Sequence, residues 1–301
     1  MTAELQERRN PAEPERANRG RQVIREILRN RLALASLVFL TAVSLFAFLA
    51  PLLPGLDPYQ VNLAHLDEGA SWQYVFGTDG SGRDTFARTV YATRTSLIVG
   101  FSSVGIYICI GTVLGTVAGF FGGAIDAVIS RLVDALLSIP LLLLVTVFVA
   151  FLQPGVLTVI LVIGLLGWPA TVRITRAQTL SLRESDFIVA ARVTGLTAGR
   201  ILRVHVLPNL AAPIIVVASL GVGTAILLEA ALGFLGLGVR PPTPSLGVMV
   251  TAAVDSVVLR NHPWQWLPPS IVLALLVMAV NILGDAVRDA LAPRLGGTKG
   301  L

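Results

Sequence analysis

Long stretches almost free of charged residues recur along the 301-residue chain. About 20 consecutive apolar residues form a helix long enough to cross a hydrocarbon core of roughly 30 Å, so each stretch is a candidate spanning segment. The fourth stretch contains a single charged residue, Glu229. The stretches are residues 32–53, 95–119, 135–172, 204–239 and 261–284.

The third stretch is too long for one crossing and long enough for two. Gln153, Pro154 and Gly155 lie near its middle, and Pro-Gly is a turn signal. The pattern therefore predicts an all-α, polytopic membrane protein with six transmembrane helices. We expect a largely disordered tail, a first helix with an external loop, a core of five helices, and a short second tail; these are residues 1–30, 31–94, 95–290 and 291–301.

Composition agrees with a membrane protein, and the placement of charge gives its orientation. Hydrophobic residues make up 54%, mean hydropathy is +0.76, and charged residues are 14%, against about 25% in soluble domains. Of the 23 basic residues, 18 fall in the tails and in the loops on the same side as the tails. Cytoplasmic loops carry the excess of Lys and Arg, so both termini are predicted to be cytoplasmic. The net charge of +5 then reflects the orientation of the protein in the membrane, and we expect no nucleic-acid partner.

Several classes of chemistry lack the residues they need. The only lysine, Lys299, is near the end of the chain, which excludes a phosphate-loop or Schiff-base lysine within a structured element. Cys109 is the only cysteine, and the three histidines are far apart in the sequence, so we expect no metal site. We predict a non-catalytic subunit: a transporter or channel component, ahead of a receptor or an assembly factor.

The connector at residues 171–209 carries six arginines and is predicted to lie on the cytoplasmic side. Apolar and small residues recur at helical spacing over residues 186–194, where Asp186 could cap a short helix and Gly195 could end it. A second short helix, residues 197–206, should end before Pro208. The pair either docks into a groove of a partner or lies on the lipid surface, with Arg192 and Arg200 touching headgroups.

Two external features have structural interpretations. Asp79-Gly80 and Ser81-Gly82 form turns, and Asp84 can begin a helix that runs into the second span, so this segment closes the outer end of the bundle. Glu229 lies 18 residues after Ala211, or about 27 Å along a helix, close to the outer interface. Glu229 either packs against another helix or the outer loop, or it faces a pathway.

Four motifs lie within roughly residues 25–295. They are DFIVAARVTGL (186–196) with HVLPN (205–209), FGTDGSGRD (76–84) with RTSL (94–97), EAALGFLGLG (229–238), and NILGD (281–285) with RDAL (288–291). The first, in the connector, resembles the EAA loop of ABC importer permeases. The other three are similar to motifs of the C-type permeases of oligopeptide and dipeptide importers.

The resemblance implies roles for particular residues. The coupling loop between spans 4 and 5 would contact an ATPase, the external motif would form a gate or a docking surface for a binding protein, and Glu229 would be a pathway candidate. The implied coupling residues are Asp186, Ala190, Ala191, Arg192, Gly195, His205 and Pro208. The implied external residues are Gly77, Thr78, Asp79, Arg83 and Asp84.

The resemblance also implies partners and a location. These are a second permease subunit, forming a heterodimer, two cytoplasmic ABC ATPases that bind ATP and Mg, an extracytoplasmic substrate-binding protein, and the lipid of a bacterial inner membrane. No cofactor is expected on this chain. Short peptides are the leading cargo, with nickel or other metal chelates, glutathione and oligosaccharides as alternatives. A self-contained channel or secondary carrier is the contrasting class.

This sequence departs from the family pattern at three places. Val189 stands where the family has the glutamate of the EAA loop, Leu246 stands where relatives have Trp before Gly247, and Ala292 replaces an Asp. With Val189, docking would rest on the shape of the helix around Ala190, Ala191 and Gly195.

Overall fold

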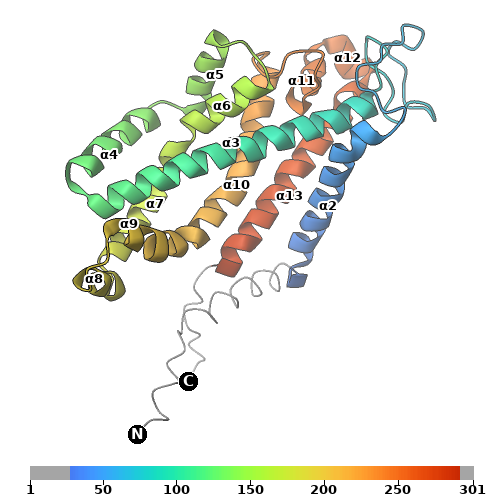
Figure 1. Cartoon of the computed structure of the whole chain (residues 1–301). Coiled ribbons are helices and arrows are strands. Elements are labelled where there is room, and N and C mark those ends of the chain that lie inside the picture. Colours follow the sequence, from blue (N-terminus) through green and yellow to red (C-terminus); the bar gives the residue numbers. More distant parts are fainter. Residues whose placement is uncertain (1–27, 292–301) are drawn as a thin grey trace, which may run out of the picture.

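The computed structural model describes residues 28–291. All the regular secondary structure in that part of the chain is helical (Figure 1). The predicted tails fall outside the described residues except at their inner ends. The α-helices are α2 (Arg31–Leu49), α3 (Thr85–Phe121), α4 (Gly123–Leu137), α5 (Leu141–Phe151), α6 (Val156–Leu166), α7 (Trp168–Arg183), α8 (Asp186–Val193), α9 (Ala198–Ile201), α10 (Leu207–Phe234), α11 (Leu246–Val250), α12 (Ser256–Asn261) and α13 (Leu267–Leu291). The short 3₁₀ and π segments are η1 (Ala50–Leu52), η2 (Leu202–Val206), η3 (Thr251–Val254) and η4 (Pro263–Gln265).

Five segments of the described chain are long and apolar enough to cross a membrane, and a bent helix pair makes a sixth. The all-α, six-helix prediction is therefore confirmed. The five are Arg31–Leu52, Thr85–Phe121, Val156–Arg183, Ala198–Phe234 and Pro263–Leu291.

The third span differs from the straight helix expected to begin at residue 135. α4 and α5 meet at an angle of 84°, and α5 has 11 residues, or about 16 Å, roughly half of a hydrocarbon core. Pro140 has an extended backbone at this break, and proline supplies no N–H to continue the helix. The predicted turn after α5 is confirmed, since the next helix starts at Val156.

The helices on either side of the connector extend further into it than predicted. α7 continues to Arg183, and α9, η2 and α10 form one helical segment from Ala198 to Phe234. Pro208 therefore does not end a helix; the π-turn η2 widens the backbone just before it, with the Leu207 N–H bonded to the Leu202 carbonyl. The connector is short, comprising α8 and its flanking turns.

A glycine repeat brings α3 and α7 into close contact. Gly111, Gly115 and Gly119 lie at intervals of four on α3, and a Cβ on Gly111 would be 2.5 Å from the Thr171 Cβ of α7. The Thr175 hydroxyl lies 3.0 Å from the Gly111 carbonyl oxygen. Small residues at such intervals allow membrane helices to approach closely. This packing explains why α7 stays helical beyond the apolar stretch.

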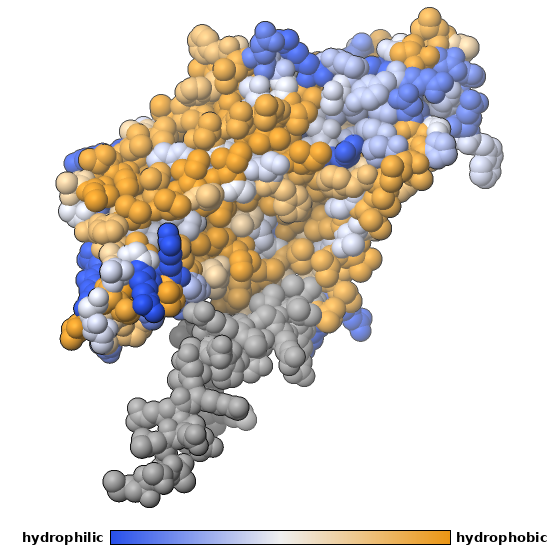
Figure 2. All heavy atoms as spheres, in the orientation of Figure 1, coloured by the Kyte–Doolittle hydropathy of each residue, from blue (hydrophilic) through white to orange (hydrophobic). Residues whose placement is uncertain are grey.

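The bundle has two distinct ends. The start of α2, the end of α13 and α8 lie at one end, here the α8 end; the segment between η1 and α3, with α11 and α12, lies at the other, the loop end (Figure 1). Figure 2 shows a broad hydrophobic surface between these ends and hydrophilic residues gathered at each. The largest core cluster contains residues of α3, α5, α6, α10, α11 and α13, so it runs through the middle of the bundle.

Candidate functional site

At the α8 end, a short helix ends in the predicted left-handed glycine. Gly195 has φ +78°, the Leu196 N–H bonds to the Ala191 carbonyl at 3.2 Å, and the Gly195 N–H bonds to the Arg192 carbonyl at 3.0 Å. This pair of bonds is the Schellman arrangement, in which a glycine reverses the chain after a helix. The N-cap differs from the prediction: Ser185, not Asp186, is the extended residue before the helix, and Asp186 occupies the first turn.

The two alanines of α8 differ in exposure. Ala191 is buried with Ile188 in a second core cluster, which also contains Phe120 of α3 and Leu210 of α10. Ala190 is exposed. Of the two alanines expected to shape the docking surface, only Ala190 is therefore available to a partner, because a step of one residue turns a side chain about 100° around the helix.

The exposed side of α8 carries three large apolar side chains beside Asp186 and Ala190. Phe187 and Val189 are about half exposed, and Val193 is 83% exposed. The Arg192 guanidinium lies 5.0 Å above the Phe120 ring, which ties the α8 end of α3 to this helix. His205 is half-buried, with its ring 6.3 Å from that of Phe187, and Pro208 follows in the continuous helix. All seven predicted coupling residues thus lie on α8 or on the segments that follow it.

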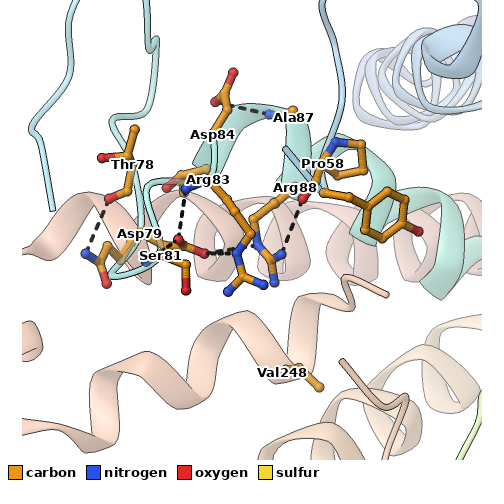
Figure 3. Close-up of polar contacts among 12 residues, drawn as sticks. Pro58, Thr78, Asp79, Ser81, Arg83, Asp84, Ala87, Arg88 and Val248 are labelled. Atoms are coloured by element: carbon orange, nitrogen blue, oxygen red, sulfur yellow. Dashed lines mark hydrogen bonds and ion pairs between the residues drawn. The ribbon is translucent and has the colours of Figure 1, made fainter. Parts of the chain in front are cut away.

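At the loop end, Asp79 organises the predicted external motif. Its carboxylate accepts hydrogen bonds from the backbone N–H groups of Ser81 and Arg83, at 2.9 and 3.0 Å, and from the Arg83 side chain at 2.8 Å. The Arg88 guanidinium lies 3.5 Å from the same carboxylate and is 7% exposed. Figure 3 shows both arginines of this network directed at Asp79.

Asp84 begins α3, as predicted. Its side chain accepts from the backbone N–H groups of Phe86 and Ala87, at 2.8 and 3.3 Å. Burial raises the pKa of the Asp84 carboxyl, and these two hydrogen bonds oppose that shift. The helix starts ten residues before the predicted span because the charges in its first turns are accommodated: Arg88 by Asp79, and Arg94 by stacking over the Phe48 ring.

Thr78 joins the motif to the preceding loop and to η4. It is fully buried, its hydroxyl donates to the His65 carbonyl at 2.6 Å, and its carbonyl accepts from Trp264 at 3.1 Å. Gly77 has φ +68°, and a Cβ there would collide with the Glu68 carbonyl oxygen and lie 2.7 Å from the Trp264 ring. The five predicted external residues are thus brought together in one structure at the loop end.

Glu229 is enclosed within the chain. Its side chain is fully buried in α10 and accepts hydrogen bonds from Ser96 of α3 and from Ser245, just before α11. Of the two interpretations, packing against neighbouring elements describes this geometry, and the carboxyl does not line an open cavity. Among residues 28–291, no three His, Cys, Asp or Glu side chains are grouped to hold a metal ion.

Comparison with known proteins identifies the family. Residues 111–297 match the family described as "Binding-protein-dependent transport system inner membrane component". The chain belongs to this family of permeases. Residues 18–69 of the permease match a second family, the "N-terminal TM domain of oligopeptide transport permease C".

Named relatives cover most of the permease. It is 42% identical to the dipeptide transport system permease protein DppC of Alkalihalophilus pseudofirmus, over 91% of this chain and 90% of the relative. It is 40% identical to DppC of Haemophilus influenzae, over 88% of this chain and 92% of the relative. It is 33% identical to the oligopeptide transport system permease protein OppC of Bacillus subtilis, over 88% of this chain and 87% of the relative.

The fold of the permease also resembles a solved structure. A chain of the MetNI methionine ABC transporter, in an inward-facing conformation, superposes with a TM-score of 0.57 at 19% identity. The match covers 68% of the permease and 97% of the other chain. This likeness supports the helical fold assigned above.

Some structurally important residues of the permease were not singled out by their sequence pattern. Asp126 of α4 forms an ion pair with Arg176 of α7, with its Oδ2 2.7 Å from Arg176 Nη2. Gln265 donates to Asp67 at 2.6 Å across the loop end. The partners in these pairs are 50 and 198 residues apart, so no local pattern could predict them. For α4, the nearest available signal was the spacing of Asp126, Ser130 and Asp134 along one helix face.

Proposed function

We propose that this permease is one subunit of an ATP-binding-cassette importer for short peptides. It would form half of the translocation pathway beside a second, different permease subunit. The named dipeptide and oligopeptide permeases support the choice of cargo. Binding of ATP and Mg, and hydrolysis, would belong to two partner ATPases, with this chain as the non-catalytic transmembrane subunit.

The observation that carries the coupling role is the outward face of α8. Phe187, Val189 and Val193 expose apolar side chains, around Asp186 and Ala190, on a helix anchored from behind by Ile188 and Ala191. A rigid helix with an apolar face suits a groove on a partner protein. Closure of two ATPases around ATP would move the paired α8 helices, and the bundle would alternate between inward- and outward-facing states.

The same proposal sets the orientation. The α8 end would face the cytoplasm together with both termini, which the excess of arginine on that side supports. The loop end would then face outward in the bacterial inner membrane. The network of Gly77, Thr78, Asp79, Arg83 and Asp84 would form part of the surface that receives the loaded binding protein.

Reconstitution tests this function. The permease, its partner permease, the two ATPases and the binding protein are incorporated into liposomes, and ATP hydrolysis and uptake are measured with dipeptides and longer peptides. We expect peptide-loaded binding protein to stimulate both. Stimulation by a nickel chelate, glutathione or an oligosaccharide, and not by peptides, would show that this compound is the substrate. Uptake by this chain without ATPases would indicate a channel or secondary carrier.

A further inference from the structure

A carboxyl group at the loop end of α10 links three elements. Glu229 Oε2 lies 2.8 Å from the Ser96 hydroxyl of α3, and Oε1 lies 2.6 Å from the Ser245 hydroxyl. Glu229, Ser96 and Ser245 are each fully buried. Both carboxyl oxygens therefore have a partner, as a polar group excluded from solvent requires.

Ser245 is the residue at which the chain returns from the loop and begins α11. Behind it, α11 lies directly on α10: a Cβ on Gly247 would be 2.5 Å from the Ala230 Cα, and one on Gly233 would be 3.0 Å from the Val248 nitrogen. Leu246 and Met249 of α11 are buried in the main core cluster. The short helix is thus held by backbone packing on one side and by Glu229 at its start.

A five-residue helix has little stability of its own. Its position depends on contacts with neighbouring elements. Glu229 of α10 supplies two directed bonds there, one to Ser245 at the start of α11 and one to Ser96 of α3. Apolar packing alone is non-directional, whereas a carboxyl held by two hydroxyls fixes an angle and a register.

We propose that Glu229 is a positioning residue that fixes the start of α11 to α3 and α10, so that α11, at the loop end, moves together with these two helices. The consequence for uptake rests on the importer function proposed above. The structural part of the proposal does not, because it concerns contacts within one chain.

Two substitutions separate this role from simple filling of space. In Glu229→Gln, the amide has an oxygen and an N–H₂ group, so it can still bond to both serine hydroxyls, which act as donor or acceptor. In Glu229→Leu, the volume is similar but both hydroxyls lose their partner. The proposal predicts that Glu229→Gln retains the position of α11 and Glu229→Leu does not.

A buried reporter on α11 measures this difference. Met249 is 7% exposed, and Met249→Cys is introduced into a Cys109→Ser chain within the assembled complex. An impermeant thiol reagent should label this cysteine slowly in the chain that retains Glu229 and in Glu229→Gln. Labelling should be roughly tenfold faster or more in Glu229→Leu, because each lost buried hydrogen bond favours local opening by about that factor. As an exposed control, a cysteine at Val254, which is 69% exposed, should react rapidly in every background.

Serine variants keep the test valid if Glu229→Leu does not fold. Ser245→Ala and Ser96→Ala each remove one bond to Glu229 and should raise labelling of Met249→Cys. The matched control is Ser219→Ala on α10, whose hydroxyl bonds only to carbonyls of its own helix, and it should leave labelling unchanged.

Equal protection of Met249→Cys in the Glu229→Leu and unsubstituted chains would overturn the proposal, and so would equal exposure in Glu229→Gln and Glu229→Leu. If the labelling pattern holds while peptide uptake is absent even in the unsubstituted complex, the proposed function fails and the positioning role stands. If both hold, maximal uptake should fall in Glu229→Leu and be retained in Glu229→Gln.

Discussion

At the residue scale, Ala190 and Ala191 are neighbours in sequence with opposite surroundings. Ala191 is 7% exposed and packs with Phe120 and Ile188, whereas Ala190 is exposed on α8. A single substitution at each position therefore separates folding of the helix from its contact with a partner.

We expect Ala191→Leu to overpack the cluster beneath α8 and to destabilise the permease by about 1–3 kcal/mol. Ala190→Leu should leave stability within about 0.5 kcal/mol, as surface substitutions do, and should lower ATPase stimulation by the loaded binding protein. Thermal unfolding and stimulated ATP hydrolysis of the purified complex measure the two effects. The reverse pattern, with Ala190→Leu unfolding the helix, would contradict the orientation of α8.

Gly195 gives a second prediction at this scale. No atom lies within 4 Å of a Cβ built at Gly195, so Gly195→Ala is penalised only by its φ of +78°, at about 1–2 kcal/mol. Gly199 is equally open and has no positive φ, so Gly199→Ala should instead stabilise its helix by about 0.5–1 kcal/mol. Thermal unfolding midpoints that move in the same direction for both variants would exclude the left-handed turn.

At the element scale, α4 is held to α7 by two ion pairs of different exposure. Asp126 and Arg176 are 19% and 35% exposed, and their paired side chains make two contacts. Asp134 and Arg173 are about 60% exposed and 2.8 Å apart. An exposed pair is stabilising by about 0–1 kcal/mol, and the more enclosed, bidentate pair should exceed it.

We expect Asp126→Asn to destabilise the complex more than Asp134→Asn. A double-mutant cycle of each aspartate with its arginine partner, monitored by thermal unfolding, measures the two coupling energies. An equal or smaller coupling for Asp126 and Arg176 would show that α4 is held to α7 by its apolar contacts.

Charge-free stretches predicted the number of spans because the apolar core of a bilayer excludes charge. They misplaced the ends of spans wherever charges are paired: Arg88 with Asp79, and Arg176 with Asp126. The Gly195 turn could be predicted because a left-handed residue after a helix favours glycine. The surroundings of Glu229 could not, since its partners are 133 and 16 residues away and are set by tertiary packing.

At the scale of the whole molecule, the orientation can be tested by labelling. Ser71, Thr197 and Ser256 are all exposed, so a cysteine at each is accessible to a reagent on its own side. In a Cys109→Ser background, Ser71→Cys and Ser256→Cys should react with an impermeant thiol reagent in intact cells. Thr197→Cys should react only after the membrane is opened, and its labelling in intact cells would reverse the orientation.

The length of α3 has a mechanical consequence. Its 37 residues extend over about 55 Å, well beyond the thickness of a bilayer core, and Figure 1 shows it crossing the bundle obliquely. One end begins at Asp84 beside the Asp79 network, and Phe120 at the other lies beneath Arg192 of α8. A rod of this length acts as a lever: each degree of tilt displaces one end by about 1 Å relative to the other. Small rotations driven at either surface of the membrane are thereby delivered to the opposite surface without passing through a chain of side-chain rearrangements.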